Sequence, residues 1–220
     1  MLTWGDGSYD DFGHGNTLNK YTPRKIPGIS NAVSISAGTG FSAAIKDDGT
    51  VWTWGNNDRG QLGRTDTSTK TPGQVTGLSE ISKIACGENF IIALMDYDTI
   101  YSWGANTCGQ LGDGTKADRI TPAAVISSYS DISADREHVL AISGGKLYAW
   151  GQNSVGQLGL NDKIDRTTPT LVSSINGNVN SIRTGYNHSI AILSDGTLYT
   201  WGEERDLSLI HISEPTRHAQ

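Results

Sequence analysis

A tryptophan–glycine dipeptide that returns about every fifty residues constrains this chain more than any other feature. Its tryptophans are Trp4, Trp54, Trp103, Trp150 and Trp201, at spacings of 50, 49, 47 and 51 residues. Three copies continue as NNDRGQLG, ANTCGQLG and QNSVGQLG, and a proline follows each of the first four tryptophans after 18 or 19 residues. A period of this length is typical of repeat architectures. One structural unit is therefore used several times.

Each unit has the pattern of short antiparallel strands. Runs such as VSISAG and TVWTW are rich in β-branched and aromatic residues. Between the second and third runs stand DDGT, DYDT, SGGK and SDGT, and Asp-Gly or Gly-Gly supplies the positive φ angles of a tight hairpin. Helical periodicity is absent throughout. About four strands per repeat predicts an all-β fold, a β-propeller with four-stranded antiparallel blades.

The GQLG passages suggest a mechanical role. We expect their glycines to form turns or to allow close backbone approach, and the leucine between them to fill an apolar gap. The first copy departs from the pattern, because YDDFG has Asp11 in place of Gln and Phe12 in place of Leu.

The combined pattern resembles that of the regulator-of-chromosome-condensation repeat family, I-x-x-G-x-x-H-S-x-A-I-x-x-D-G-x-L-Y-x-W-G-x-N-x-x-G-Q-L-G. The copy IRTGYNHSIAILSDGTLYTWG, Ile182 to Gly202, is the best match, and the resemblance covers nearly all of residues 1–206. It implies a β-propeller, usually of seven blades. Kelch repeats have a similar period but need a Gly-Gly doublet in each repeat. That doublet occurs once here, at Gly144-Gly145, so kelch ranks far behind.

The repeat divides the chain into about four blades. Residues 1–27 would end a preceding blade, and repeats follow near 28–77, 78–126, 127–174 and, truncated, 175–206. Seven blades would need about 350 residues. The resemblance therefore implies that residues 1–206 are part of a propeller.

The end of the chain breaks the repeat. After Trp201 the pattern requires Asn at 204 and GQLG at 207–210, but the chain has Glu204 and then LSLI. The segment LSLIHISEPTR, residues 207–217, resembles an in-frame translation of a transposon-end adapter used to prepare sequencing libraries. We therefore interpret residues 207–220 as a non-native, adapter-derived tail, and we exclude its histidines from any site.

The composition of the chain excludes several classes of binding partner. The net charge is −6 and no cluster of Lys and Arg appears, so nucleic acid is not an expected partner. No apolar run approaches the ~20 residues of a membrane-spanning helix. The two cysteines form neither a disulfide framework nor a zinc motif.

Candidate catalytic residues have simpler structural interpretations. His138 and His188 share one repeat position with Phe41 and Phe90, which indicates a packing position. Cys86 aligns with small residues elsewhere, and Cys108 with a variable loop position. The Asp-Gly pairs are explained by hairpin geometry rather than by calcium binding. We therefore expect no catalytic residue, no cofactor and no metal, and hence no enzyme.

Two positions in each repeat vary while their neighbours are constant. They lie between the Gly and the His or Phe, in GTGFS, GENFI, DREHV and GYNHS, and we expect them to face solvent. In the resembled family this loop contacts partners in several members. The candidate partner-binding residues are Glu88, Asn89, Arg136, Glu137, Tyr186 and Asn187. None of these passages holds a tryptophan, so the tryptophan-based light sensing of one plant member is not supported.

The hypothesis favoured by these patterns is a non-enzymatic scaffold that binds another protein through variable loops on one propeller face. Guanine-nucleotide exchange on a small Ran-type GTPase, the activity of the family's founding member, is an alternative, although its contacts do not map onto this sequence residue by residue. A secreted, enzyme-inhibitor-like binder is a further alternative. A hydrolase ranks last, because no nucleophile, base and orienting group can be named.

Overall fold

The computed structural model describes residues 1–5, 7, 12–65, 68–96, 98–126 and 128–203. The described residues form seventeen β-strands and no helix. The sequence-based interpretation of residues 207–220 as an adapter-derived tail falls outside the described part of the chain.

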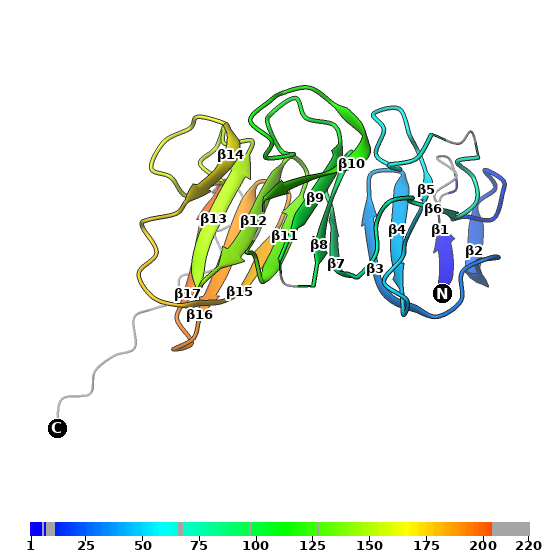
Figure 1. Ribbon diagram of the computed structural model, residues 1–220, viewed down its shortest axis with the longest axis horizontal. Coiled ribbons are helices and arrows are strands. Elements are labelled where there is room, and N and C mark those ends of the chain that lie inside the picture. Colours follow the sequence, from blue (N-terminus) through cyan, green and yellow to red (C-terminus); the bar gives the residue numbers. More distant parts are fainter. Residues whose placement is uncertain (6, 8–11, 66–67, 97, 127, 204–220) are drawn as a thin grey trace.

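The strands form five antiparallel sheets (Figure 1). The first sheet has two strands, β1 (Leu2–Gly5) and β2 (Lys20–Lys25). The next contains β3 (Ala32–Gly38), β4 (Phe41–Lys46), β5 (Val51–Gly55) and β6 (Gly73–Gln74). The third contains β7 (Ile81–Cys86), β8 (Phe90–Met95), β9 (Ile100–Gly104) and β10 (Arg119–Ile126).

The fourth sheet contains β11 (Asp131–Asp135), β12 (His138–Ser143), β13 (Lys146–Gly151) and β14 (Arg166–Leu171). The fifth contains β15 (Val179–Thr184), β16 (His188–Leu193) and β17 (Leu198–Gly202). Strands that follow one another in the chain are neighbours in every sheet. Each sheet is therefore an up-and-down blade, as the hairpin signals predict.

The first four sheets stand side by side in chain order (Figure 1), and the fifth packs against the fourth through β15, which contacts β11 and β12, as in a propeller. Their first strands form the inner row, because β3 contacts β7, β7 contacts β11, and β11 contacts β15. The fourth strands β6, β10 and β14 lie at the outer edges of their sheets. This confirms the all-β propeller that the repeat predicts.

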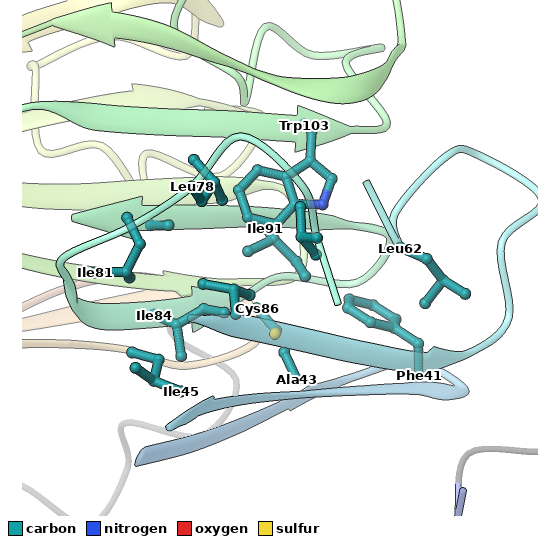
Figure 2. Packing of buried hydrophobic residues seen from close by; sticks show 13 residues of the cluster. Phe41, Ala43, Ile45, Leu62, Leu78, Ile81, Ile84, Cys86, Ile91 and Trp103 are labelled. Carbon is teal, nitrogen blue, oxygen red and sulfur yellow. The ribbon is translucent and has the colours of Figure 1, made fainter. Parts of the chain in front are cut away.

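The core lies between blades rather than within one blade. Three of the buried clusters each combine residues of two neighbouring blades. Figure 2 shows the first of these, in which Ala43 and Ile45 of β4 pack with Ile84 and Cys86 of β7. A single twisted sheet cannot bury both of its faces, so each blade depends on its neighbours for stability.

The WG and GQLG motifs meet at three junctions between blades. The indole N–H of Trp103 donates to the carbonyl oxygen of Gln61 in the preceding blade at 3.0 Å. Trp150 and Trp201 make the same bond to Gln110 and Gln157, both at 2.9 Å. We call this arrangement the Trp–loop contact. It explains why the two motifs recur together, since each supplies one half of the junction.

The GQLG turn has the glycine and leucine roles that its sequence predicts. Gly63 has a φ of 67°, and a Cβ built on it would lie 2.5 Å from the indole nitrogen of Trp103. Only glycine therefore fits between the turn and the tryptophan ring. Leu62 beside it is fully buried, where it fills the apolar gap.

The inner face of the first complete blade is uncovered in the described residues. Ile35 of β3 is 63% exposed, whereas its counterparts Ile84, Ile132 and Ile182 are 6%, 1% and 1% exposed. The difference arises because each of the later blades is covered by the blade before it. Trp4 in β1 is likewise 59% exposed.

Candidate protein-binding face

The candidate residues lie in the turns that join the first and second strands of each blade. These turns comprise residues 39–40, 87–89, 136–137 and 185–187, and together they form what we call the first-turn face. Backbone bonds join the turns across blades. The Thr39 N–H donates to the Glu88 carbonyl at 3.0 Å, and the Glu88 N–H donates to the Arg136 carbonyl at 2.7 Å. The face is therefore built on a fixed backbone.

A second set of bonds holds each turn from within its own blade. The residue after the WG dipeptide donates its N–H to the carbonyl of the second variable position. Ala105 bonds to Asn89 at 2.9 Å, and Gln152 bonds to Glu137 at 2.8 Å. The same bond recurs in the other blades, so the turn backbone is constant while its side chains vary.

Arg136 lies at the centre of the face and connects three blades. Its Nη1 donates to the side-chain oxygen of Asn187 at 2.8 Å. Its Nε lies 3.7 Å from a carboxylate oxygen of Glu88. Its guanidinium carbon is 4.4 Å from the centroid of the Tyr186 ring, a cation–π distance. These contacts fix the orientation of the tyrosine.

The remaining candidates are tied to neighbouring loops. The Asn187 amide donates to Glu203 at 2.7 Å, and the Gln61 amide donates to Asn89 at 3.3 Å. Glu137 accepts a hydrogen bond from the Thr107 hydroxyl at 3.4 Å. Asn89 and Glu137 therefore lie against the GQLG turns rather than in the central group.

The sequence predicts that all six residues face solvent, and this is fully met only at Tyr186, which is 61% exposed. Glu88, Asn89, Arg136, Glu137 and Asn187 are half-buried. They lose exposure because their side chains bond across blade junctions, which repeat spacing does not reveal. Glu88, Arg136, Tyr186 and Asn187 form one connected group with a single exposed aromatic ring.

Two acidic residues of this face are absent from the six that the repeat pattern predicts. Glu203 binds Asn187, and Asp135 lines a cavity of about 340 Å³ together with Glu88, Arg136 and Tyr186. A signal for Glu203 existed, because the residue after WG varies while the dipeptide is constant. Asp135 stands where three other copies have Gly38, Gly87 and Gly185, and that departure was also visible.

Asp135 accounts for the position of His138. In the fourth copy the histidine ring covers the glycine, and a Cβ built on Gly185 would lie 2.2 Å from the His188 ring. The Cβ of Asp135 excludes the same placement. The His138 ring reaches the next blade instead, with Nε2 3.0 Å from the Ser189 hydroxyl oxygen. Its side chain is fully buried.

Burial sets the proton affinity of the groups beside the face. Burial, followed by the nearby His188, lowers the pKa of His138 to about 4. Burial raises the pKa of Cys86 to about 12. Burial and then Glu137 raise the pKa of Cys108 to about 11. Both thiols are therefore protonated at neutral pH, which is the unreactive form.

The described residues hold no group of three or more His, Cys, Asp or Glu side chains that could bind a metal ion together. Nor does this part of the chain contain a helix with the length and apolar character that crossing a membrane requires.

The stacked antiparallel blades, the Trp–loop contacts and the first-turn face define a repeat-built β-propeller. A family model described as an RCC1-like domain matches residues 1–218, and the chain belongs to this family. The ultraviolet-B receptor UVR8 of Arabidopsis thaliana is 32% identical over 213 residues, 92% of this chain and 48% of that protein. The human E3 ubiquitin-protein ligase HERC2 is 38% identical over 65 residues, 29% of this chain and 1% of that protein.

Solved structures agree with the family. Yeast RCC1 (Prp20), in a crystal structure with Kap60, superposes with a TM-score of 0.81 at 25% identity and covers 92% of this chain and 52% of its own. Prp20p from Saccharomyces cerevisiae, described with its binding to Gsp1p and histones, superposes with a TM-score of 0.80 at 26% identity. The match covers 91% of this chain and 53% of the Prp20p chain. The chain spans about half the length of UVR8 and of Prp20p.

Proposed function

We propose that this chain is a non-enzymatic protein–protein interaction scaffold that binds another protein through the first-turn face. The observation that carries the proposal is the contact group of Glu88, Arg136, Tyr186 and Asn187, which spans three blades. It presents an exposed aromatic ring on a fixed backbone.

The physical properties of this group suit an interface. Tyrosine and arginine are the residue types that contribute much of the binding energy in protein complexes. Here Arg136 holds the Tyr186 ring before any partner arrives, so little side-chain entropy is lost on binding. The half-buried Glu88 and Asn187 around the ring supply the polar rim that interfaces usually have.

The chemistry around the face also favours binding over catalysis. His138 is buried and bonded to Ser189, and the pKa values of both cysteines lie far above neutral pH. A nucleophile, a base and an orienting group do not come together among the described residues. Relatives bind other proteins, since Prp20 forms a complex with Kap60.

The proposal is tested by affinity capture from a cell lysate. Three proteins are immobilised for this purpose: the unchanged chain, the double variant Tyr186→Ala/Arg136→Ala, and the variant Lys146→Ala. Lys146 is the exposed first residue of β13, at the end of the strands opposite to the first-turn face. Quantitative mass spectrometry should find a protein retained by the unchanged chain and by Lys146→Ala but lost from the double variant. Equal retention by all three, or retention by none, would contradict the proposal.

Guanine-nucleotide exchange is the second candidate, favoured by the similarity to Prp20p, which is described with its binding to Gsp1p. A Ran-type GTPase loaded with a fluorescent GDP analogue provides the test. Exchange activity predicts that the chain accelerates release of the analogue in the presence of excess GTP. Release at the intrinsic rate, while affinity capture succeeds, would leave the scaffold as the function.

A further inference from the structure

The outer strand β2 carries a feature that the first-turn face does not use. Its sequence is KYTPRK, and Thr22 and Pro23 are both exposed. In the described residues β2 pairs only with β1, in a two-stranded sheet. Thr22 therefore lies in an extended segment at the edge of the molecule, where another protein can reach it.

The pairing of β2 is irregular around Thr22. Leu2 pairs with Lys25 and Thr3 with Arg24, and the register then shifts so that Gly5 pairs with Lys20. Thr22 lies inside the shifted stretch. The same kind of shift occurs in β10 and β14, around Thr121 and Thr168. All three threonines are exposed and precede a proline, so their local geometry is comparable.

What distinguishes Thr22 is its charge environment. Arg24 and Lys25 follow the Thr-Pro pair, whereas Gly-Gln follows Thr71-Pro72, Ala-Ala follows Thr121-Pro122 and Thr-Leu follows Thr168-Pro169. A hydroxyl followed by proline and then by basic residues is the pattern recognised by proline-directed protein kinases of the cyclin-dependent class. These kinases bind their substrates as extended segments, and β2 already has that conformation.

The same cations are placed to hold a phosphate. Lys20 and Arg24 each lie two residues from Thr22. The Lys20 ammonium donates to the Asn16 side-chain oxygen at 2.8 Å, and the Asn16 amide donates to the His14 carbonyl at 3.3 Å. Burial and then the charges of Lys20 and Arg24 lower the pKa of His14. His14 in turn lies 3.2 Å from the Thr3 hydroxyl, and Thr3 is the residue that pairs with Arg24. The two cations therefore lie near the same part of this sheet.

We propose that Thr22 is a phosphorylation site for a proline-directed Ser/Thr kinase, with its phosphate held between Lys20 and Arg24. The threonine Oγ1 attacks the γ-phosphorus of ATP, an O–P bond forms and the β–γ phosphoanhydride bond breaks. ADP leaves, and the hydroxyl proton passes to a base of the kinase. The product carries about −1.5 to −2 charges at neutral pH, which Lys20 and Arg24, on either side of Thr22 in β2, would neutralise.

The first test incubates the whole chain with a cyclin-dependent kinase and ATP and localises phosphate by mass spectrometry. The proposal predicts phosphate on Thr22, little on Thr121 or Thr168, and complete loss of the main product in Thr22→Ala. The matched variant Thr121→Ala should leave the yield unchanged. Because Thr22 is exposed, its replacement should not alter folding, which circular dichroism would verify.

A peptide of residues 18–27 serves as an accessibility control. Phosphorylation of the peptide without phosphorylation of the chain would overturn the proposal, since the folded strand would then be unavailable. Equal labelling of Thr121 and Thr168 would overturn it as well, because the basic residues would have no effect. Failure to label either peptide or chain would show that the sequence is not recognised.

The second test measures how the phosphate is held. Phosphorus NMR titration of the phosphorylated chain should give a second phosphate pKa below the usual value of about 6. The variant Lys20→Gln/Arg24→Gln should restore the usual value. An unshifted pKa in the unchanged chain would contradict the placement of the phosphate between the two cations.

Discussion

At the scale of single residues, the repeat preserves those that form contacts between blades. Gly63 is required both by its positive φ and by the Trp103 ring beside it, and Leu62 fills the space under the turn. The sequence revealed these roles because the motif recurs in register. It did not reveal that His138 would turn toward Ser189, since that placement depends on a side chain at Asp135 rather than on the histidine itself.

Replacing Gly63 with Ala should separate backbone strain from steric conflict with the tryptophan. Gly77→Ala is the matched control, because Gly77 has a φ of 81° but no atom within 4 Å of a built Cβ. We expect the control to lose about 1–2 kcal/mol of unfolding free energy. Gly63→Ala should lose about 1–3 kcal/mol more through overpacking. Urea unfolding measures both, and equal losses would rule out the steric role.

His138 should make stability depend on pH. Its pKa of about 4 in the folded chain is below the value of about 6.5 in unfolded chains, so the unfolded state binds more protons between these values. Its contribution is fully present above pH 6.5 and is lost as pH falls toward 4, by about 3 kcal/mol in total. Urea unfolding from pH 7 to 4 should show this loss. The variant His138→Gln should show a correspondingly shallower dependence, and identical profiles would contradict the assignment.

At the scale of strands and turns, hairpins were the most predictable elements. The Asp-Gly turns give Gly49 and Gly196 φ angles of 74° and 89°, as the motif requires. The outer strands were harder to predict, because their pairing contains irregular register and one, β6, has only two residues. The repeat pattern indicated which six residue positions belong to the candidate face. Its bonding was not predictable, because the partners of Arg136 lie about fifty residues away on either side.

The contacts of Arg136 should affect the face more than the stability of the blades. Its side chain and that of Glu88 are 28% and 39% exposed, and exposed ion pairs contribute about 0–1 kcal/mol. We therefore expect Arg136→Ala to change the unfolding free energy by about 1 kcal/mol while releasing the Tyr186 ring. NMR of the tyrosine ring, compared with Lys146→Ala as control, would detect this. An immobile ring in Arg136→Ala would show that other contacts orient it.

At the scale of the whole molecule, the fold is a row of blades in which each covers the next. The first complete blade presents Ile35, which is 63% exposed, at a position that its successors bury. An apolar surface of this kind promotes association. Family and architecture were predictable because they follow from the repeat period. The exposure of Ile35 was not predictable from the period, because the same repeat position is buried in the later blades.

The chain should therefore self-associate through this surface. Sedimentation velocity should show a weight-average sedimentation coefficient that rises with protein concentration. The variant Ile35→Lys should abolish the rise. Ile164→Lys, at a residue that is equally exposed at 66% but lies in the connection before β14, should not. A monomer at all concentrations would contradict this role for the surface.

If the first-turn face binds a protein partner, that partner lies within reach of position 186. A photo-crosslinking amino acid that keeps an aromatic ring is placed at Tyr186 and, separately, at Lys146. Each protein is then irradiated in the presence of the partner found by affinity capture. Binding at this face predicts a covalent adduct from position 186 and none from position 146. Adducts of equal yield from both positions, or an adduct only from position 146, would contradict it.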